Sequence, residues 1–341
     1  MRTLICVLML GTCSVGVQAQ EKLLKLSALT RVDYQREYVG GDAVHENSGF
    51  KGQYFMLCLD GTITKDFSYS YRQRLNKAHS DQSFFDATDW ARLIYTPDGH
   101  WSISAGKEVV GIGGYEYDRH PADIYMASEY WNNIACYQLG ATVGYTPNGG
   151  KDKLAVQVTQ SPFRYNSPDM YAYNLTWSGS HGCLGTLYSA NIVEYRPGKY
   201  ISYLAFGHRI SLGRLRLEAD FMNRASSGQA FLFKDCSIMA ELSYRPIDKL
   251  NLFGKVTYDV NRTRKAADLC VVPGTELTDV GGGIEFYPHK TVRVHAAYAH
   301  SFGKNGNPDG VVLPGSDRMS VGLTWNINLL SLDNPWMRQK D

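Results

Sequence analysis

The chain has 341 residues, a formal net charge of +2 and a hydrophobic fraction of 44%. Its charges form no basic block, which excludes the electrostatic footprint of a nucleic-acid-binding protein. The composition combines 23 Tyr and 33 Gly with only 12 Pro, and this indicates an all-β protein with many turns.

The N-terminus has the pattern of a secretory signal peptide. Arg2 precedes an apolar run at 4–10, and small residues follow up to Val17-Gln18-Ala19. This order of basic, apolar and small residues predicts a signal peptide at 1–19, cleaved before Gln20. The mature chain contains no apolar run of the roughly eighteen residues that a membrane-spanning helix requires. The sequence therefore predicts an exported protein without such a helix.

From residue 23 onwards, short segments alternate between apolar and polar residues. Successive side chains of a strand point to opposite faces, so each segment predicts a strand with one apolar and one polar face. We count about sixteen, the even number expected of a closed bacterial barrel, and most are long enough to cross a bilayer. The approximate spans are 23–39, 50–61, 64–76, 86–96, 100–108, 135–147, 151–161, 170–179, 182–195, 199–212, 213–223, 234–246, 249–261, 276–287, 290–303 and 317–328.

The connections between these segments alternate in length. Tight turns such as Asn148-Gly149-Gly150 and Leu212-Gly213 alternate with longer stretches such as 261–275 and 303–316. Short periplasmic turns and long extracellular loops are typical of an outer-membrane barrel. Aromatic residues beside the turns fit an interfacial girdle: Tyr95, Trp101, Tyr145, Trp177, Tyr244, Phe286 and Trp325. The alternative is a soluble all-β sandwich or solenoid.

We therefore expect an all-β protein, a transmembrane antiparallel β-barrel of about 16 strands over 20–328, with a C-terminal tail at 329–341. The longest segment without a strand pattern is 108–133, the third outer loop. A long structureless connection in a compact domain is usually functional. We expect this loop to fold into the barrel and narrow it, the alternative being an ordinary surface loop.

The polar faces of the strands carry many charges, which a water-filled barrel of this size can hydrate. We expect these lumen-facing residues: Arg31, Asp33, Arg72, Arg74, Arg92, Arg209, Arg216, Glu218, Asp220, Glu241, Lys255, Asp259, Glu285, Arg293 and Arg318. Six of the arginines would form one wall sector when the barrel closes: Arg31, Arg72, Arg74, Arg92, Arg293 and Arg318. The acidic loop would face this sector and complete the constriction with Glu116, Asp118, Arg119, Asp123 and Glu129. Alternatively, the arginines pair with Asp33, Asp66 and Asp89 and only hold the wall together.

The stretch around this loop also resembles a known family. Ser104–Lys107, Gly111–Asp118 and Pro121–Tyr125 are similar to the Bacteroidetes branch of the phosphate-selective porin O/P family. The resemblance implies a homotrimer of sixteen-stranded outer-membrane channels with an inward third loop. Phosphate selectivity does not transfer, because that property goes with a basic constriction whereas this loop is acidic. The C-terminal tail also departs from the usual ending of such barrels on an aromatic residue.

The function predicted is that of an outer-membrane porin for passive diffusion of small hydrophilic solutes or ions, with outer-membrane lipid as its surroundings. The alternatives are an anchor or accessory subunit of an envelope complex, and a barrel enzyme. For an enzyme, the only catalytic-looking cluster is His79-Ser80-Asp81, and adjacent residues seldom form a triad. The mature cysteines lack C-x-x-C spacing, so we expect no zinc site, no disulfide framework and no cofactor.

Overall fold

The computed structural model describes residues 22–335 apart from 78–84, 148, 165–166 and 230–231. The expected signal peptide and the His79-Ser80-Asp81 cluster lie outside the described residues. The strands are β1 (Lys22–Val39), β2 (Asp42–Ala43), β3 (Gly49–Thr62), β4 (Phe67–Arg74), β5 (Thr88–Tyr95), β6 (Trp101–Val109), β7 (Tyr137–Tyr145), β8 (Asp152–Gln160), β9 (Tyr171–His181), β10 (Leu184–Arg196), β11 (Lys199–Leu212), β12 (Leu215–Ser226), β13 (Asp235–Ile247), β14 (Leu250–Asn261), β15 (Glu276–His289), β16 (Val292–Lys304) and β17 (Ser316–Asp333). The helices are the short α1 (Tyr115–Asp118) and α2 (Glu129–Asn133), with 3-10 turns at His45–Asn47 and Pro121–Asp123.

The strands form one closed antiparallel sheet. Each long strand pairs with its neighbour in sequence, and β1 pairs with both β3 and β17, which closes the barrel. Apart from the two-residue β2, sixteen strands in the described part of the chain make up the wall. The predicted all-β barrel and its strand number are therefore confirmed. β17 continues to Asp333, where it pairs with Lys22, so the last strand runs beyond the expected boundary at 328.

The alternation of side chains decides which face points outward. In β9, Tyr171, Tyr173 and Leu175 are each nearly half exposed, whereas Ala172 and Asn174 between them are buried. The apolar set lies on the outside of the barrel and the polar set on the inside, the arrangement that lipid outside and water inside require. Closure also gives every strand a partner on both edges, so no backbone edge faces hydrocarbon.

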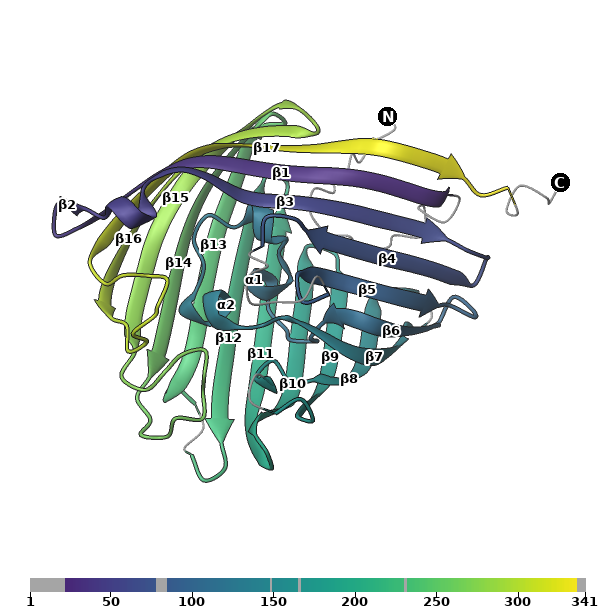
Figure 1. Ribbon diagram of the computed structural model, residues 1–341, viewed down its shortest axis with the longest axis horizontal. Coiled ribbons are helices and arrows are strands. Elements are labelled where there is room, and N and C mark those ends of the chain that lie inside the picture. Colours follow the sequence, from purple (N-terminus) through teal and green to yellow (C-terminus); the bar gives the residue numbers. More distant parts are fainter. Residues whose placement is uncertain (1–21, 78–84, 148, 165–166, 230–231, 336–341) are drawn as a thin grey trace.

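The connections separate by length between the two ends of the barrel. Residues 182–183, 213–214, 248–249 and 290–291 form tight turns at one end, and 110–136, 262–275 and 305–315 are longer connections at the other. The connection 110–136 bears α1 and α2, which lie within the ring of strands in Figure 1. None of the helices described is long and apolar enough to cross a membrane.

Candidate pore constriction

The segment 110–136 is attached to the inner face of the barrel by its backbone. Gly111 N–H donates to Gln157 Oε1 at 2.6 Å, and Gly113 N–H donates to Ser189 Oγ at 2.8 Å. A Cβ on Gly113 would lie 2.8 Å from the Ser189 nitrogen, closer than packed atoms allow. Glycine at this position therefore lets the loop lie directly on β10.

Two inward-facing carboxylates bind the backbone at the start of the two short helices. Asp220 of β12 accepts from the N–H groups of Tyr115 and Glu116, at 2.8 and 2.7 Å. Asp259 of β14 accepts from the N–H of Glu129 at 2.8 Å. The first N–H groups of a helix have no partner inside the helix, so these wall carboxylates supply the missing acceptors and fix α1 and α2 in place.

A buried ion pair ties α1 to β14. The Lys255 ammonium lies 2.6 Å from Glu116 Oε1 and also donates to the carbonyl of Met126 at 2.9 Å. Glu116 accepts in addition from the backbone N–H of Ser128, at 3.1 Å, and from its hydroxyl. Burial raises the pKa of Glu116, but the Lys255 charge and these hydrogen bonds outweigh it and hold the pKa below the ordinary value of 4.5.

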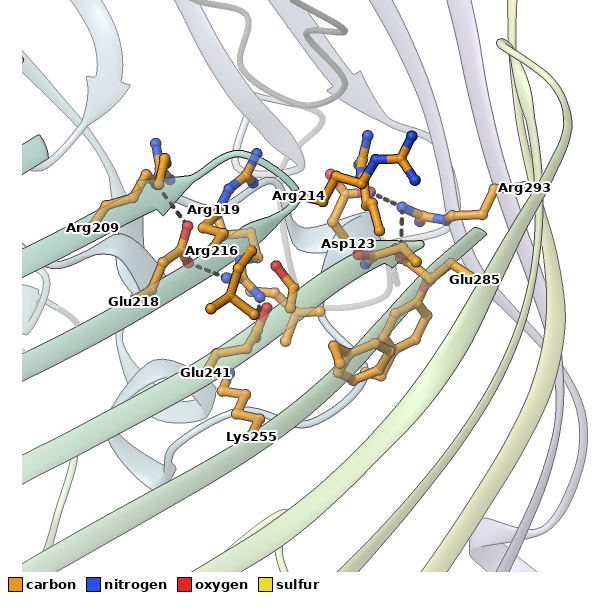
Figure 2. A pocket seen from close by; sticks show the side chains of 18 of the residues that line it. Arg119, Asp123, Arg209, Arg214, Arg216, Glu218, Glu241, Lys255, Glu285 and Arg293 are labelled. Atoms are coloured by element: carbon orange, nitrogen blue, oxygen red, sulfur yellow. Dashed lines mark hydrogen bonds and ion pairs between the residues drawn. The ribbon is translucent and has the colours of Figure 1, made fainter. Parts of the chain in front are cut away.

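Further ion pairs connect the loop to β12, β13 and β16. The Arg119 guanidinium lies between Glu218 and Glu241 and donates to both carboxylates. Asp123 accepts from Arg293 at 2.5 Å. Figure 2 shows these groups converging from the loop and from neighbouring strands. The loop thus contributes charges of both signs, and each of these charges meets an opposite charge on the wall.

One imidazole of the loop is neutral at physiological pH. Burial, together with the charge of Arg72, lowers the pKa of His120 to about 4. Its Nδ1 accepts from the backbone N–H of Ala122 at 3.2 Å, which an uncharged ring can do. This contact holds the 3-10 turn at Pro121–Asp123 in place.

Residues 124–126 lie between two hollows in the lumen. A cavity of about 610 Å³ lies toward the tight turns, and one of about 300 Å³ toward the long loops. Ile124, Tyr125, Met126 and Phe253 line both. The Tyr125 ring stacks on Phe253 with centroids 5.3 Å apart, and its hydroxyl donates to Glu285 at 2.7 Å. Residues 124–126 therefore separate the two hollows.

The larger cavity is lined by more cations than anions (Figure 2). The cations are Arg119, Arg209, Arg214, Arg216, Arg245, Lys255 and Arg293, and the anions are Asp118, Asp123, Glu218, Glu241 and Glu285. Seven positive charges against five negative charges leave an excess of two positive charges on its wall.

The predicted arginine sector divides into two parts. Arg31 and Arg293 do meet the loop: Arg31 donates to the carbonyls of Ala122 and Ile124, at 3.2 and 2.7 Å, and Arg293 binds Asp123. Four others pair with carboxylates on the strands of the wall, and one of these carboxylates, Glu108, was expected at the start of the loop but lies on β6. These pairs are Arg72 and Arg74 with Asp89, Arg92 with Glu108, and Arg318 with Asp279.

Of the two interpretations for these arginines, pairing within the wall therefore describes Arg72 and Arg74. It also applies to Arg31, which binds Asp33 as well as the loop. Glu129 is fully buried and accepts from Asn133 at 2.8 Å, so its carboxylate does not line either lumen cavity. Asp118, by contrast, is exposed to the larger cavity.

Four ion pairs of the wall share an asymmetry in exposure. In each, the carboxylate is buried behind a guanidinium that water can reach. The exposed side-chain fractions are 22% and 2% for Arg74 and Asp89, 25% and 2% for Arg92 and Glu108, 38% and 2% for Arg209 and Glu218, and 22% and 2% for Arg318 and Asp279. Asp123 and Arg293 show the opposite order, at 23% and 7%, as do Glu116 and Lys255, at 8% and 2%. In the four asymmetric pairs, water therefore meets mainly arginine.

Sequence reasoning missed an apolar core inside the barrel. Loop residues Val110, Ile112 and Tyr130 pack against Ile201 and Tyr203, which face inward from β11. The available signal was the stretch Tyr200–Phe206, where both faces of the strand are largely apolar and one of them must be covered inside. This core holds the loop to one side of the lumen. Within the part of the chain described, no group of His, Cys, Asp and Glu is arranged to hold a metal, and the cysteines are free.

Comparisons with known proteins agree with this architecture. A family described as phosphate-selective porin O and P matches residues 25–193. Among solved structures, an anion-selective porin from Comamonas acidovorans has a TM-score of 0.66 at 11% identity, covering 90% of this chain and 100% of that chain. OmpT of Vibrio cholerae has a TM-score of 0.62 at 11% identity, covering 89% and 97%. OmpF of Salmonella typhi has 0.62 at 14%, covering 92% and 99%. No curated protein matches the chain.

Proposed function

Because the chain belongs, through residues 25–193, to the phosphate-selective porin O and P family, we infer that it is an outer-membrane porin through which small hydrophilic solutes and ions diffuse passively. The closed barrel with an apolar outside and a charged inside supports a channel rather than an enzyme. A homotrimer is part of the same proposal, supported by the trimer form recorded for OmpT of Vibrio cholerae. The loop 110–136 forms the constriction, and Tyr125 lies between the two hollows of the lumen.

We further propose that the channel prefers anions to cations. The observation that carries this is the burial of the wall carboxylates behind exposed guanidinium groups. A charge that water reaches acts on a passing ion, and low-dielectric walls strengthen its field, whereas a buried partner acts from farther away. The acidic residues of the loop do not oppose this preference, because Glu116 is neutralised by Lys255 and only Asp118 and Asp123 remain accessible.

The test is the reversal potential of single channels in planar bilayers under a KCl gradient. The wild-type channel should favour chloride, and Arg74→Gln/Arg92→Gln should lower the chloride-to-potassium permeability ratio severalfold. The two substitutions leave both carboxylates with a partner. Asp89 still pairs with Arg72, and Glu108 still accepts from the hydroxyls of Ser104 and Thr142. The control is Lys249→Gln/Lys290→Gln, which removes the same charge from exposed tight turns.

A wild-type channel that favours potassium would contradict the proposed selectivity, as would an unchanged ratio in the arginine variant. The constriction is tested separately by replacing residues 115–133 with a Gly-Ser bridge. Conductance should rise severalfold while the barrel still assembles. Unchanged conductance would mean that the loop does not form the narrow part.

A further inference from the structure

A cluster of cations lies at the barrel end that carries the long connections. The β10–β11 hairpin ends at Arg196 and Lys199, and Lys265 reaches toward it from the connection 262–275. Together they border a hollow of about 720 Å³, whose lining includes these three cations and, among the residues described, no carboxylate. The hollow lies outside the lumen cavities and plays no part in the constriction.

The charges of this cluster are free to bind a ligand. Within the described part of the chain, Arg196 and Lys199 form no ion pair, and the Lys265 ammonium donates only to the carbonyl of Ser227, at 2.6 Å. The carboxylate of Glu194, two residues from Arg196, is occupied by the N–H groups of Gly198 and Tyr171, at 2.6 and 3.1 Å. The hairpin therefore presents uncompensated positive charge.

The surface next to the cluster indicates what kind of ligand fits. Tyr200 lines the hollow and is 42% exposed, on the outward face of β11. Farther along the wall, Ile192 is 50% exposed on the outward face of β10. Cations thus stand directly beyond an aromatic residue at the end of an apolar outer wall. A tyrosine in this position is typical of the level of lipid headgroups.

We propose that Arg196, Lys199 and Lys265 bind the phosphate groups of an anionic glycolipid of the outer leaflet. The guanidinium and the two ammonium groups supply charge-assisted donors to phosphate oxygens, while the acyl chains lie along Ile192 and neighbouring outward side chains. A free phosphate ion would use the cations but not the adjoining apolar wall. The site fixes lipid around the barrel and is independent of the ion preference of the pore.

The test is titration of the purified porin with a phosphorylated outer-leaflet glycolipid, with bound lipid counted by native mass spectrometry. Each cation near an anionic lipid contributes roughly fivefold in affinity. Arg196→Gln/Lys199→Gln/Lys265→Gln should therefore raise Kd by at least about tenfold. The control Lys151→Gln/Lys249→Gln/Lys290→Gln removes three exposed charges from the opposite end and should bind as the wild type does.

Two further arms identify the source of the phosphate. The same glycolipid with its phosphates removed should bind the wild type as weakly as the intact lipid binds the triple variant, and inorganic phosphate should fail to displace the intact lipid. Equal binding by wild type and triple variant overturns the proposal. Loss in the control, undiminished binding of the dephosphorylated lipid, or displacement by inorganic phosphate also overturns it. If the triple variant fails to fold, Lys265→Gln alone should show a roughly fivefold loss, and an unchanged Kd overturns the site.

Discussion

Replacing Lys255 with methionine should release the loop from the wall while leaving the barrel intact. Methionine keeps most of the volume of the side chain but removes the ammonium that lies 2.6 Å from Glu116. Glu116 is then a buried carboxylate with only the N–H and hydroxyl of Ser128 as donors. Removing one partner of a buried ion pair costs about 3–5 kcal/mol.

The lower end of that range is appropriate here, because both Ser128 hydrogen bonds remain and Lys255 borders the larger lumen cavity. A loss of about 3 kcal/mol changes the ratio of docked to undocked loops by roughly 150-fold. In single-channel records this should appear as frequent transitions to a higher conductance. Lys249→Met, on the exposed turn before β14, is the matched control and should not increase the frequency of these transitions.

The double variant Glu116→Gln/Lys255→Met separates a charge effect from a packing effect. It removes the uncompensated carboxylate, so much of the docking should return and the transitions should become rarer than in Lys255→Met alone. Barrel assembly is checked by the mobility of unheated protein on gels. If Lys255→Met shows wild-type conductance and noise, the ion pair does not hold the loop, and the reasoning fails.

Three further predictions concern the wall, the loop contact and pH. Val321→Arg, on the outward face of β17, should destabilise the barrel by about 2–4 kcal/mol near mid-membrane. Ser320→Arg, which faces the lumen one residue earlier, should not destabilise it. Equal denaturation midpoints for the two variants would contradict a wall with one lipid-facing and one water-facing side. Gly113→Ala should displace the loop and raise conductance, because the added carbon meets Ser189. Gly99→Ala is the control, since its added carbon meets open space and should leave the conductance unchanged. Identical conductance in the two variants would argue against a tight contact at Gly113. The pKa of Glu116 is lowered in the docked loop, so its contribution to docking is complete above pH 4.5 and is lost as the pH falls below that value. Channel noise should therefore rise on acidification, and it should rise less in Glu116→Gln. The same rise in both proteins would mean that another group causes the effect.

The sequence was sufficient for the barrel because its rules are periodic and local. A strand between lipid and water must alternate apolar and polar residues, and hairpin turns favour residues such as Gly, Asn and Asp, so β9 or β17 can be identified without knowing its neighbours. The strand count and the membrane class follow from these two rules. The end of β17 was harder to place, since Leu329, Leu330 and Leu332 continue an apolar run in which the alternation is lost.

The partners of charged side chains are not periodic, and this is why the constriction was only partly predictable. Sequence identifies Arg72, Arg74 and Arg92 as inward-facing, but pairing depends on register across strands. The register places Arg72 opposite Trp90, next to Asp89, and Arg72 pairs with this local carboxylate. Charge composition alone made the loop look acidic. Two of its carboxylates, Glu116 and Asp123, form ion pairs with Lys255 and Arg293, which lie more than a hundred residues away in the sequence.

The same geometry explains how a nearly neutral chain can present a charged lumen. Burying a carboxylate requires donors, and a guanidinium has five of them, so a single arginine can satisfy a buried acid and still keep N–H groups directed at water. The acid satisfied in this way is screened from the lumen by its own partner, as Glu218 is by Arg209 and Arg119. Pairs of this kind therefore stabilise the wall and present a positive charge to the lumen. The sign of the lumen is set by which member of each pair faces the water, and the net charge of the sequence does not reveal it.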